Sequence, residues 1–267
     1  MIEARAAGWE ARAQSRPGSA APNEDAYRTG GDWALVLDGI TRYPDDGCVH
    51  DVPWYTAALA ESIADGITGP DALADVLAAA IAAVNARHES TCDLGNPVSP
   101  GATAALVRRR GDRLEWLVLG DCAVAWRGPD GACRVETDGR LAALPGVPAV
   151  ELAGIRRWPV PYVASVRNRE GGFWVASTDP EAAARARTGA VPLAGVADLL
   201  LCTDGLTRLV DRYGHTWPQL LAAVFDRGVG AALDLVRAHG DRDPRPGSKR
   251  HDDATAVHLR LPEFASL

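Results

Sequence analysis

The chain has 267 residues, 47% of them hydrophobic and 24% charged, with a formal net charge of −7. This composition is ordinary for a globular protein and argues against a disordered or membrane-spanning chain, while the acidic balance argues against a general nucleic-acid binder. The length, with no strong linker, predicts a single domain over residues 1–267 with a sizeable core.

The N-terminus and the cysteines indicate the compartment. The first residues include Glu3, Arg5 and Glu10 and contain no long apolar run, so neither a secretory signal nor a membrane-spanning helix is expected. A cytoplasmic location, with no membrane partner, is the resulting expectation. The cysteines number five and form no Cys-x-x-Cys pair, which predicts reduced, mostly buried thiols: Cys48, Cys92, Cys122, Cys133 and Cys202.

The first third of the chain predicts strands followed by helices. Weak alternation over residues 3–15 indicates a strand, and the apolar run 33–37 indicates a strand that is buried on both faces. Two helices are expected next, with Asp51 and Asp71 as their N-caps. An apolar stripe at helical spacing marks the core face of the second helix.

The rest of the chain returns to strands and ends on one. An antiparallel meander is expected between residues 101 and 137. Further along, the pattern predicts strands at 172–176, 199–202 and 254–261 and helices at 179–187, 217–225 and 229–239. Strands first and last, with helix pairs between them, favour an α+β sandwich of sheets flanked by helices.

Four short acidic segments stand beside apolar runs: 23–25, 37–39, 202–205 and 251–255. Buried strands deliver such carboxylates to the rim of a sheet, where they would repel one another unless a hard cation such as Mg²⁺ or Mn²⁺ binds their oxygens. An Asp-Gly pair alone is more often a turn, but the order and context of all four segments favour one metal site. The glycines after Asp38 and Asp204 would allow the backbone to approach the ion closely.

Together with residues 100–104 and 119–122, these segments resemble the motifs of the metal-dependent protein phosphatases, the type 2C serine/threonine phosphatases. Six motifs follow the family's order through nearly the whole chain. The resemblance implies a central sandwich of two mainly antiparallel β-sheets flanked by helix pairs, a four-layer αββα arrangement. It also implies that the substrate is a phosphorylated protein, hydrolysed at phosphoserine or phosphothreonine by a water that bridges two metal ions. The oligomeric state stays open.

The resemblance also implies a set of ligands. Asp38 would bridge two Mg²⁺ or Mn²⁺ ions, with the carbonyl of Gly39 as a further ligand, and Asp204 and Asp252 would complete the pair. Two ions about 3.5 to 4 Å apart can lower the pKa of a bridging water and organise the phosphoryl oxygens for in-line attack. A nucleophile from the protein is then unnecessary.

Four further acidic residues take supporting roles in this resemblance. Glu24 and Asp25 would hold metal-bound water, and Asp121 stands at the position that contributes to a third, weaker metal in bacterial members. Asp253 stands where the family usually has asparagine, and a role in anchoring the loop is favoured over ligation.

The chain departs from the family pattern at two places. Ala20 and Ala21 stand near the usual place of an arginine that binds the substrate phosphate, so Arg16 is the candidate for that role, weighed against a solvated surface arginine. No histidine follows Asp38-Gly39, so His50 is the candidate general acid, weighed against a helix-entry residue. These departures leave two alternatives to the phosphoprotein phosphatase: a phosphatase-like regulatory or binding module without turnover, and a hydrolase of a small phosphorylated metabolite.

Overall fold

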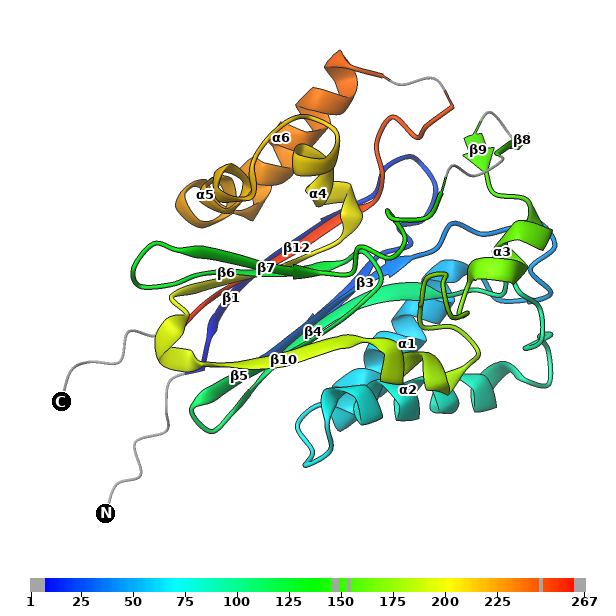
Figure 1. Ribbon diagram of the computed structural model, residues 1–267, viewed down its shortest axis with the longest axis horizontal. Coiled ribbons are helices and arrows are strands. Elements are labelled where there is room, and N and C mark those ends of the chain that lie inside the picture. The colour runs from blue at the N-terminus through cyan, green and yellow to red at the C-terminus, as the bar shows by residue number, and fades with distance from the viewer. Residues whose placement is uncertain (1–7, 146–148, 153–154, 245–246, 262–267) are drawn as a thin grey trace.

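The computed structural model describes residues 8–145, 149–152, 155–244 and 247–261. Two five-stranded antiparallel sheets pack face to face, and helices cover the outer face of each (Figure 1). The predicted α+β sandwich of two antiparallel sheets flanked by helices is therefore confirmed. No helix in the described part of the chain is both long and apolar enough to cross a membrane.

The first sheet has the order β1-β12-β11-β6-β7. Its strands are β1 (Glu10–Arg16), β12 (Ala254–Arg260), β11 (Asp198–Cys202), β6 (Ala123–Arg127) and β7 (Cys133–Thr137). The helices on its outer side are α4 (Asp204–Asp211), α5 (Trp217–Arg227) and α6 (Val229–Arg242).

The second sheet has the order β10-β5-β4-β3-β2. Its strands are β10 (Arg187–Pro192), β5 (Arg113–Leu119), β4 (Ala102–Arg110), β3 (Trp33–Gly39) and β2 (Ala26–Thr29), and its outer face is covered by α1 (Val52–Gly66) and α2 (Leu73–His88). The remaining elements are the β8 (Val150–Leu152) and β9 (Ile155–Arg157) hairpin, α3 (Val160–Val166), and the 3₁₀ turns Pro180–Arg185 and Leu193–Gly195.

The alternation of side chains along each strand divides the apolar core into three layers. On β3, Ala34 and Val36 face the first sheet, whereas Leu35 and Leu37 face α1 and α2. All four side chains are fully buried, which is why this strand reads as a continuous apolar run. Because a carboxylate is costly to bury among apolar side chains, the end of this apolar run sets where Asp38 lies.

Several predicted elements need correction. Asp51 caps α1 as expected, its carboxylate accepting the backbone N–H of Trp54 at 2.9 Å, but α2 begins at Leu73 and Asp71 does not cap it. The expected meander breaks after β5, because Gly120, at φ +77°, turns the chain into β6 of the opposite sheet. Residues 172–176 form isolated bridges and no strand, and the predicted helix at 179–187 is a 3₁₀ turn followed by β10.

The prediction of reduced cysteines is wrong for one pair. Cys48 and Cys92 form a disulfide between residues 44 positions apart. Cys122 and Cys202 are free and buried, as expected, and Cys133 is free and partly exposed. The spacing along the chain gave no sign of this pairing, because it depends on how the 40–51 segment packs against the end of α2.

Candidate metal centre

Carboxylates from both sheets line one cavity of about 340 Å³. Asp38 lies near the end of β3, and Asp121 lies in the turn between β5 and β6. Asp204 is the first residue of α4, directly after β11, and Asp252 precedes β12. The structure therefore brings together three of the four acidic segments that the sequence singled out, at the edge where the two sheets end, whereas Glu24 and Asp25 of the fourth segment do not line the cavity.

The glycines after Asp38 and Asp204 are required by contacts between these segments. A Cβ added at Gly39 would lie 2.4 Å from the carbonyl oxygen of Glu24, and one added at Gly205 would lie 1.9 Å from that of Asp253. Any side chain at either position would push the acidic segments apart. The glycines therefore allow one acidic segment to approach another, whereas an approach to the ion itself stays a prediction.

Asp253 anchors the loop that carries Glu24. Its two carboxylate oxygens accept the backbone N–H groups of Gly18, at 2.6 Å, and of Glu24, at 2.7 Å. These contacts use both oxygens of the side chain. They fit the loop-anchoring role that the sequence favoured for Asp253 over a ligand role.

Asp25 is buried, and the described residues donate hydrogen bonds to one of its two carboxylate oxygens but not to the other. Its Oδ2 accepts the hydroxyls of Thr203, at 2.9 Å, and Thr255, at 2.7 Å, whereas its Oδ1 has no hydrogen-bond partner among the described residues. Burial raises the pKa of Asp25 to about 8, although the two hydroxyls favour the charged form. An orphaned carboxylate oxygen in such a place is what a bound cation, or a water held by one, would satisfy.

The carboxylates nearest the centre of the cavity disfavour each other's charge. The pKa of Asp38 lies well above its usual range because of burial and the neighbouring Asp204, Asp25 and Asp121. Burial, followed by the charges of Asp121 and Asp252, raises the pKa of Asp204 to about 7. The backbone N–H of Asp204 donates to Oδ2 of Asp38 at 3.2 Å, which ties the two segments together. A divalent cation would relieve this repulsion, so the donor set fits Mg²⁺ or Mn²⁺.

Asp252 differs from the other carboxylates because basic side chains already contact it. Its Oδ1 accepts Nζ of Lys249 at 2.8 Å, and its Oδ2 accepts the guanidinium of Arg208. Burial opposes ionisation of Asp252, but these two charges prevail and lower its pKa. Lys249 also lies 3.9 Å from a carboxylate oxygen of Glu24, whose pKa burial raises.

The cavity carboxylates are spread out and do not meet at one point. Among the described residues, Cys48, His88 and Cys92 form the one group of three potential ligands whose ligand atoms all lie within 4.8 Å of one another. A centre that distributes carboxylates over two ions does not require three oxygens within that distance. The described carboxylates therefore do not by themselves close a single ion site.

Arg16 and His50 are not brought to the carboxylates. Arg16 forms an ion pair with Asp234 of α6, on the helix side of its sheet, and does not line the cavity. The ring of His50 stacks on Trp54 with centroids 3.9 Å apart and lies 6.2 Å from the ring of His88, also outside the cavity lining. The phosphate-binding and general-acid roles expected for these two residues therefore lack support from the geometry.

Three basic side chains that the sequence did not single out line the same cavity: Arg167, Arg208 and Lys249. Arg167 is 8% exposed, and its Nη2 finds no hydrogen-bond partner among the described residues. Burial lowers the pKa of Arg167 to about 10, so the side chain is still cationic near neutral pH. Arg208, four residues after Asp204 on the same helix face, was the one of the three that spacing could have indicated.

An apolar wall extends the cavity away from the carboxylates. Its aromatic members are Tyr43, Trp158 and Phe173. The Trp158 ring packs edge-on against Phe173, with centroids 5.7 Å apart, and Tyr43 donates to the carbonyl of Trp158 at 3.1 Å. The site thus combines carboxylates, buried cations and an aromatic side, which suits a ligand with an anionic group on a partly apolar carrier.

No protein-family model matches the sequence, and no curated protein matches it either. Solved structures, in contrast, share the fold over almost the whole chain. The Mycobacterium tuberculosis serine/threonine phosphatase PstP/Ppp is 18% identical with a TM-score of 0.62, and the match covers 95% of this chain and 99% of that one. The catalytic domain of PstP in complex with two manganese ions is 17% identical with a TM-score of 0.57, covering 95% and 98% of the two chains.

A third solved structure is PppA, described as a regulatory component of the type VI secretion system of Pseudomonas aeruginosa. It is 17% identical with a TM-score of 0.61, and the match covers 96% of this chain and 98% of that one. At these identities the likeness shows the fold. The resemblance seen in the sequence motifs is confirmed at that level.

Proposed function

We propose that this chain, which has the fold of the metal-dependent protein phosphatases, is a divalent-metal-dependent phosphatase that acts on phosphoserine and phosphothreonine in proteins. The observation that carries the proposal is the convergence of Asp38, Asp121, Asp204 and Asp252 on one cavity that also holds buried cations. Carboxylates alone would serve many cation sites. Carboxylates next to basic side chains, one of which has an unpartnered nitrogen, suit a phosphate bound beside metal ions.

The carboxylate oxygens of the cavity are suitable ligands for divalent metal ions. Asp38 and Asp204 would hold the ions, with Asp252 completing the oxygen donors from the cavity wall, and the orphaned oxygen of Asp25, which does not line the cavity, would accept from a water held by an ion. Bound divalent ions would supply an activated water and positive charge facing the phosphoryl group. We assign Mg²⁺ or Mn²⁺ because oxygen-only ligand sets favour hard cations.

Arg167 takes the phosphate-binding role that the sequence assigned to Arg16. Its side chain lines the cavity, and its Nη2 is buried without a partner among the described residues, so a small shift of the guanidinium toward the cavity would let that nitrogen donate to a phosphate oxygen without breaking an existing bond. A Cβ added at Gly101 would lie 2.2 Å from that nitrogen, so the glycine leaves the space in which the guanidinium lies. The aromatic side of the cavity would contact the carrier of the phosphate.

A second candidate is a regulatory or binding module that keeps the fold without turnover. The observation in its favour is the pairing of Asp252 with Arg208 and Lys249, because a carboxylate that is already neutralised needs no metal. Such a module would bind a phosphorylated segment through the same cations but would not hydrolyse it.

Hydrolysis of an aryl phosphate and of a phosphothreonine peptide, each measured with EDTA, Mg²⁺ and Mn²⁺, decides between the two. An enzyme is inactive in EDTA, active with at least one of the metals, and nearly inactive as Asp38→Asn. The matched control is Asp32→Asn, which changes an exposed aspartate outside the cavity and should behave as wild type. Binding of the phosphopeptide without turnover under every metal condition would favour the module.

A further inference from the structure

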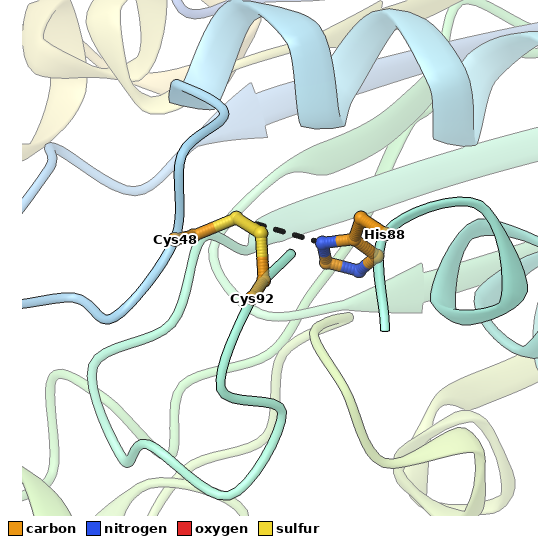
Figure 2. Close-up of side chains that lie close together, drawn as sticks. All are labelled: Cys48, His88 and Cys92. Carbon is orange, nitrogen blue, oxygen red and sulfur yellow. Dashed lines mark hydrogen bonds between the residues drawn. A yellow bond between two sulfur atoms is a disulfide. The ribbon is translucent and has the colours of Figure 1, made fainter. Parts of the chain in front are cut away.

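The Cys48–Cys92 disulfide lies against a buried histidine that the proposed phosphatase reaction does not use. Nδ1 of His88 is 3.6 Å from Sγ of Cys48 and faces the disulfide (Figure 2). His88 is 1% exposed, and its other ring nitrogen, Nε2, has no hydrogen-bond partner among the described residues. A buried imidazole with an unpartnered nitrogen is uncommon in native structures and points to a role other than packing.

The three side chains have the composition of a zinc site. Two sulfurs and one imidazole nitrogen, all within 4.8 Å of one another, are the ligand types that Zn²⁺ prefers. Zinc binds thiolates at about 2.3 Å and imidazole at about 2.0 to 2.1 Å, so at the tetrahedral angle a sulfur and a nitrogen ligand lie about 3.6 Å apart. Nδ1 of His88 and Sγ of Cys48 already have that separation.

We propose that Cys48, Cys92 and His88 form a zinc-binding site when the disulfide between the two cysteines is reduced. A dithiol reductant would convert the disulfide into two thiols and become a cyclic disulfide itself. Zinc would then displace one proton from each thiol. The two sulfurs would then move apart to the roughly 3.8 Å that two thiolates on one tetrahedral zinc require.

The backbone around the pair is held in place without the disulfide. The N–H of Asp93 donates to the carbonyl of Gly47 at 2.8 Å, and the side chain of Asn96 donates to the carbonyl of Asp45 at 2.9 Å. On the other side, the N–H of Cys92 donates to the carbonyl of His88 at 2.9 Å, which fixes the spacing of those two ligands at the end of α2. Reduction should therefore leave the ligands close together, so that the site is preorganised for an ion.

Three protein ligands leave a fourth tetrahedral position, which a water molecule or His50 would fill. The ring of His50 lies 6.2 Å from that of His88, and its side chain is partly exposed. The same segment of chain, a few residues earlier, provides Thr41 and Tyr43 to the wall of the acidic cavity. A zinc ion here would hold this segment against α2 in the reduced protein as the disulfide does in the oxidised protein.

The test uses Co²⁺ and Zn²⁺ as probes on the full chain, purified in a reducing buffer with chelator removed before titration. Co²⁺ bound by thiolates gives a sulfur-to-metal charge-transfer absorption that carboxylate ligands do not give, so the acidic cavity does not interfere. Because the acidic cavity also takes up divalent ions, we expect this absorption to reach a plateau with Co²⁺ in excess and Zn²⁺ to remove it. Thiol titration before the addition of metal confirms reduction.

Cys48→Ser and Cys92→Ser each leave one thiolate and should each weaken the thiolate absorption, the double variant should abolish it, and Cys133→Ser, at a free and partly exposed cysteine on β7, is the matched control that should keep it. His88→Gln should keep the absorption with affinity lowered by about tenfold or more, since a ligand is lost. Absence of the absorption in the reduced wild type would overturn the proposal, as would a signal that survives both serine substitutions. Persistence of the disulfide in reducing buffer with zinc present would overturn it as well, because zinc should favour the dithiol.

Discussion

Asp204→Asn should stabilise the metal-free protein at alkaline pH while removing metal binding. Burial and the charges of Asp121 and Asp252 raise the pKa of Asp204 from 3.8 to about 7. Between those two values the folded protein holds a proton that the unfolded chain has released. The unfolded state therefore binds fewer protons, and the free energy of unfolding falls as pH rises through this window.

The size of this loss in the free energy of unfolding follows from the pH range between the pKa values of Asp204 in the unfolded and folded states. Between about pH 5 and about pH 8 the unfolded chain keeps Asp204 ionised, whereas the folded protein loses the proton only near pH 7. Over the roughly two pH units below that point, linkage at about 1.4 kcal/mol per unit gives a loss of about 3 kcal/mol. Asparagine does not titrate, so the variant does not share this loss. The free energy of unfolding of Asp204→Asn, relative to that of the wild type, should therefore increase by about 3 kcal/mol between about pH 5 and about pH 8.

Denaturant-induced unfolding in EDTA at both pH values measures this difference, with Asp32→Asn as the control for loss of a carboxylate outside the cavity. With Mn²⁺ added, the melting temperature of the wild type should rise because the ion binds only the folded state, and that of Asp204→Asn should not. A difference between variant and wild type that is the same at both pH values would refute the reasoning that Asp204 is buried among repelling charges. Unchanged Mn²⁺ affinity of Asp204→Asn by calorimetry would remove this residue from the metal site.

Three further substitutions test individual contacts. Arg167→Lys keeps the charge but loses the planar fork, and it should lower kcat/KM for a phosphothreonine peptide by about tenfold or more; wild-type kinetics would remove Arg167 from the substrate site. His50→Ala should slow a phosphothreonine peptide no more than an activated aryl phosphate, because the ring lies outside the cavity; a selective loss of about a hundredfold would restore it as general acid. Asp253→Ala leaves two backbone N–H groups without their acceptor and should lower the free energy of unfolding by about 2 kcal/mol or more, whereas an unchanged denaturation midpoint would show that the loop is held elsewhere.

The acidic cavity was predictable because each of its signals is local. The run 33–37 is apolar throughout since both of its faces are buried, and Asp38 follows at the point where that burial ends. The same logic holds for residues 199–202 and Asp204. Antiparallel pairing of β11 with β12 then places the segment before β12 beside the one after β11, so Asp252 lies beside Asp204.

The missed features depend on contacts between distant segments. Asp204-Gly205 has the composition of a turn, yet it begins α4, and the bare Cα of Gly205 packs against the backbone of Asp253. Arg167 follows a short helix that gave only ambiguous periodicity, and its place at the cavity depends on the space beside Gly101. The Cys48–Cys92 pair likewise requires the tertiary arrangement of two loops.

The basic residues at Asp252 link metal binding to phosphate binding. Lys249 donates to Asp252 and to the hydroxyl of Thr41, at 2.7 Å, and Arg208 uses its guanidinium on the same carboxylate. Under the proposed function, an ion that takes over the oxygens of Asp252 would leave these cations without their present partner in the cavity. A phosphate dianion is the partner that restores neutrality. Ion and phosphate should therefore each bind more tightly in the presence of the other, which a carboxylate cluster without Lys249 and Arg208 would not require.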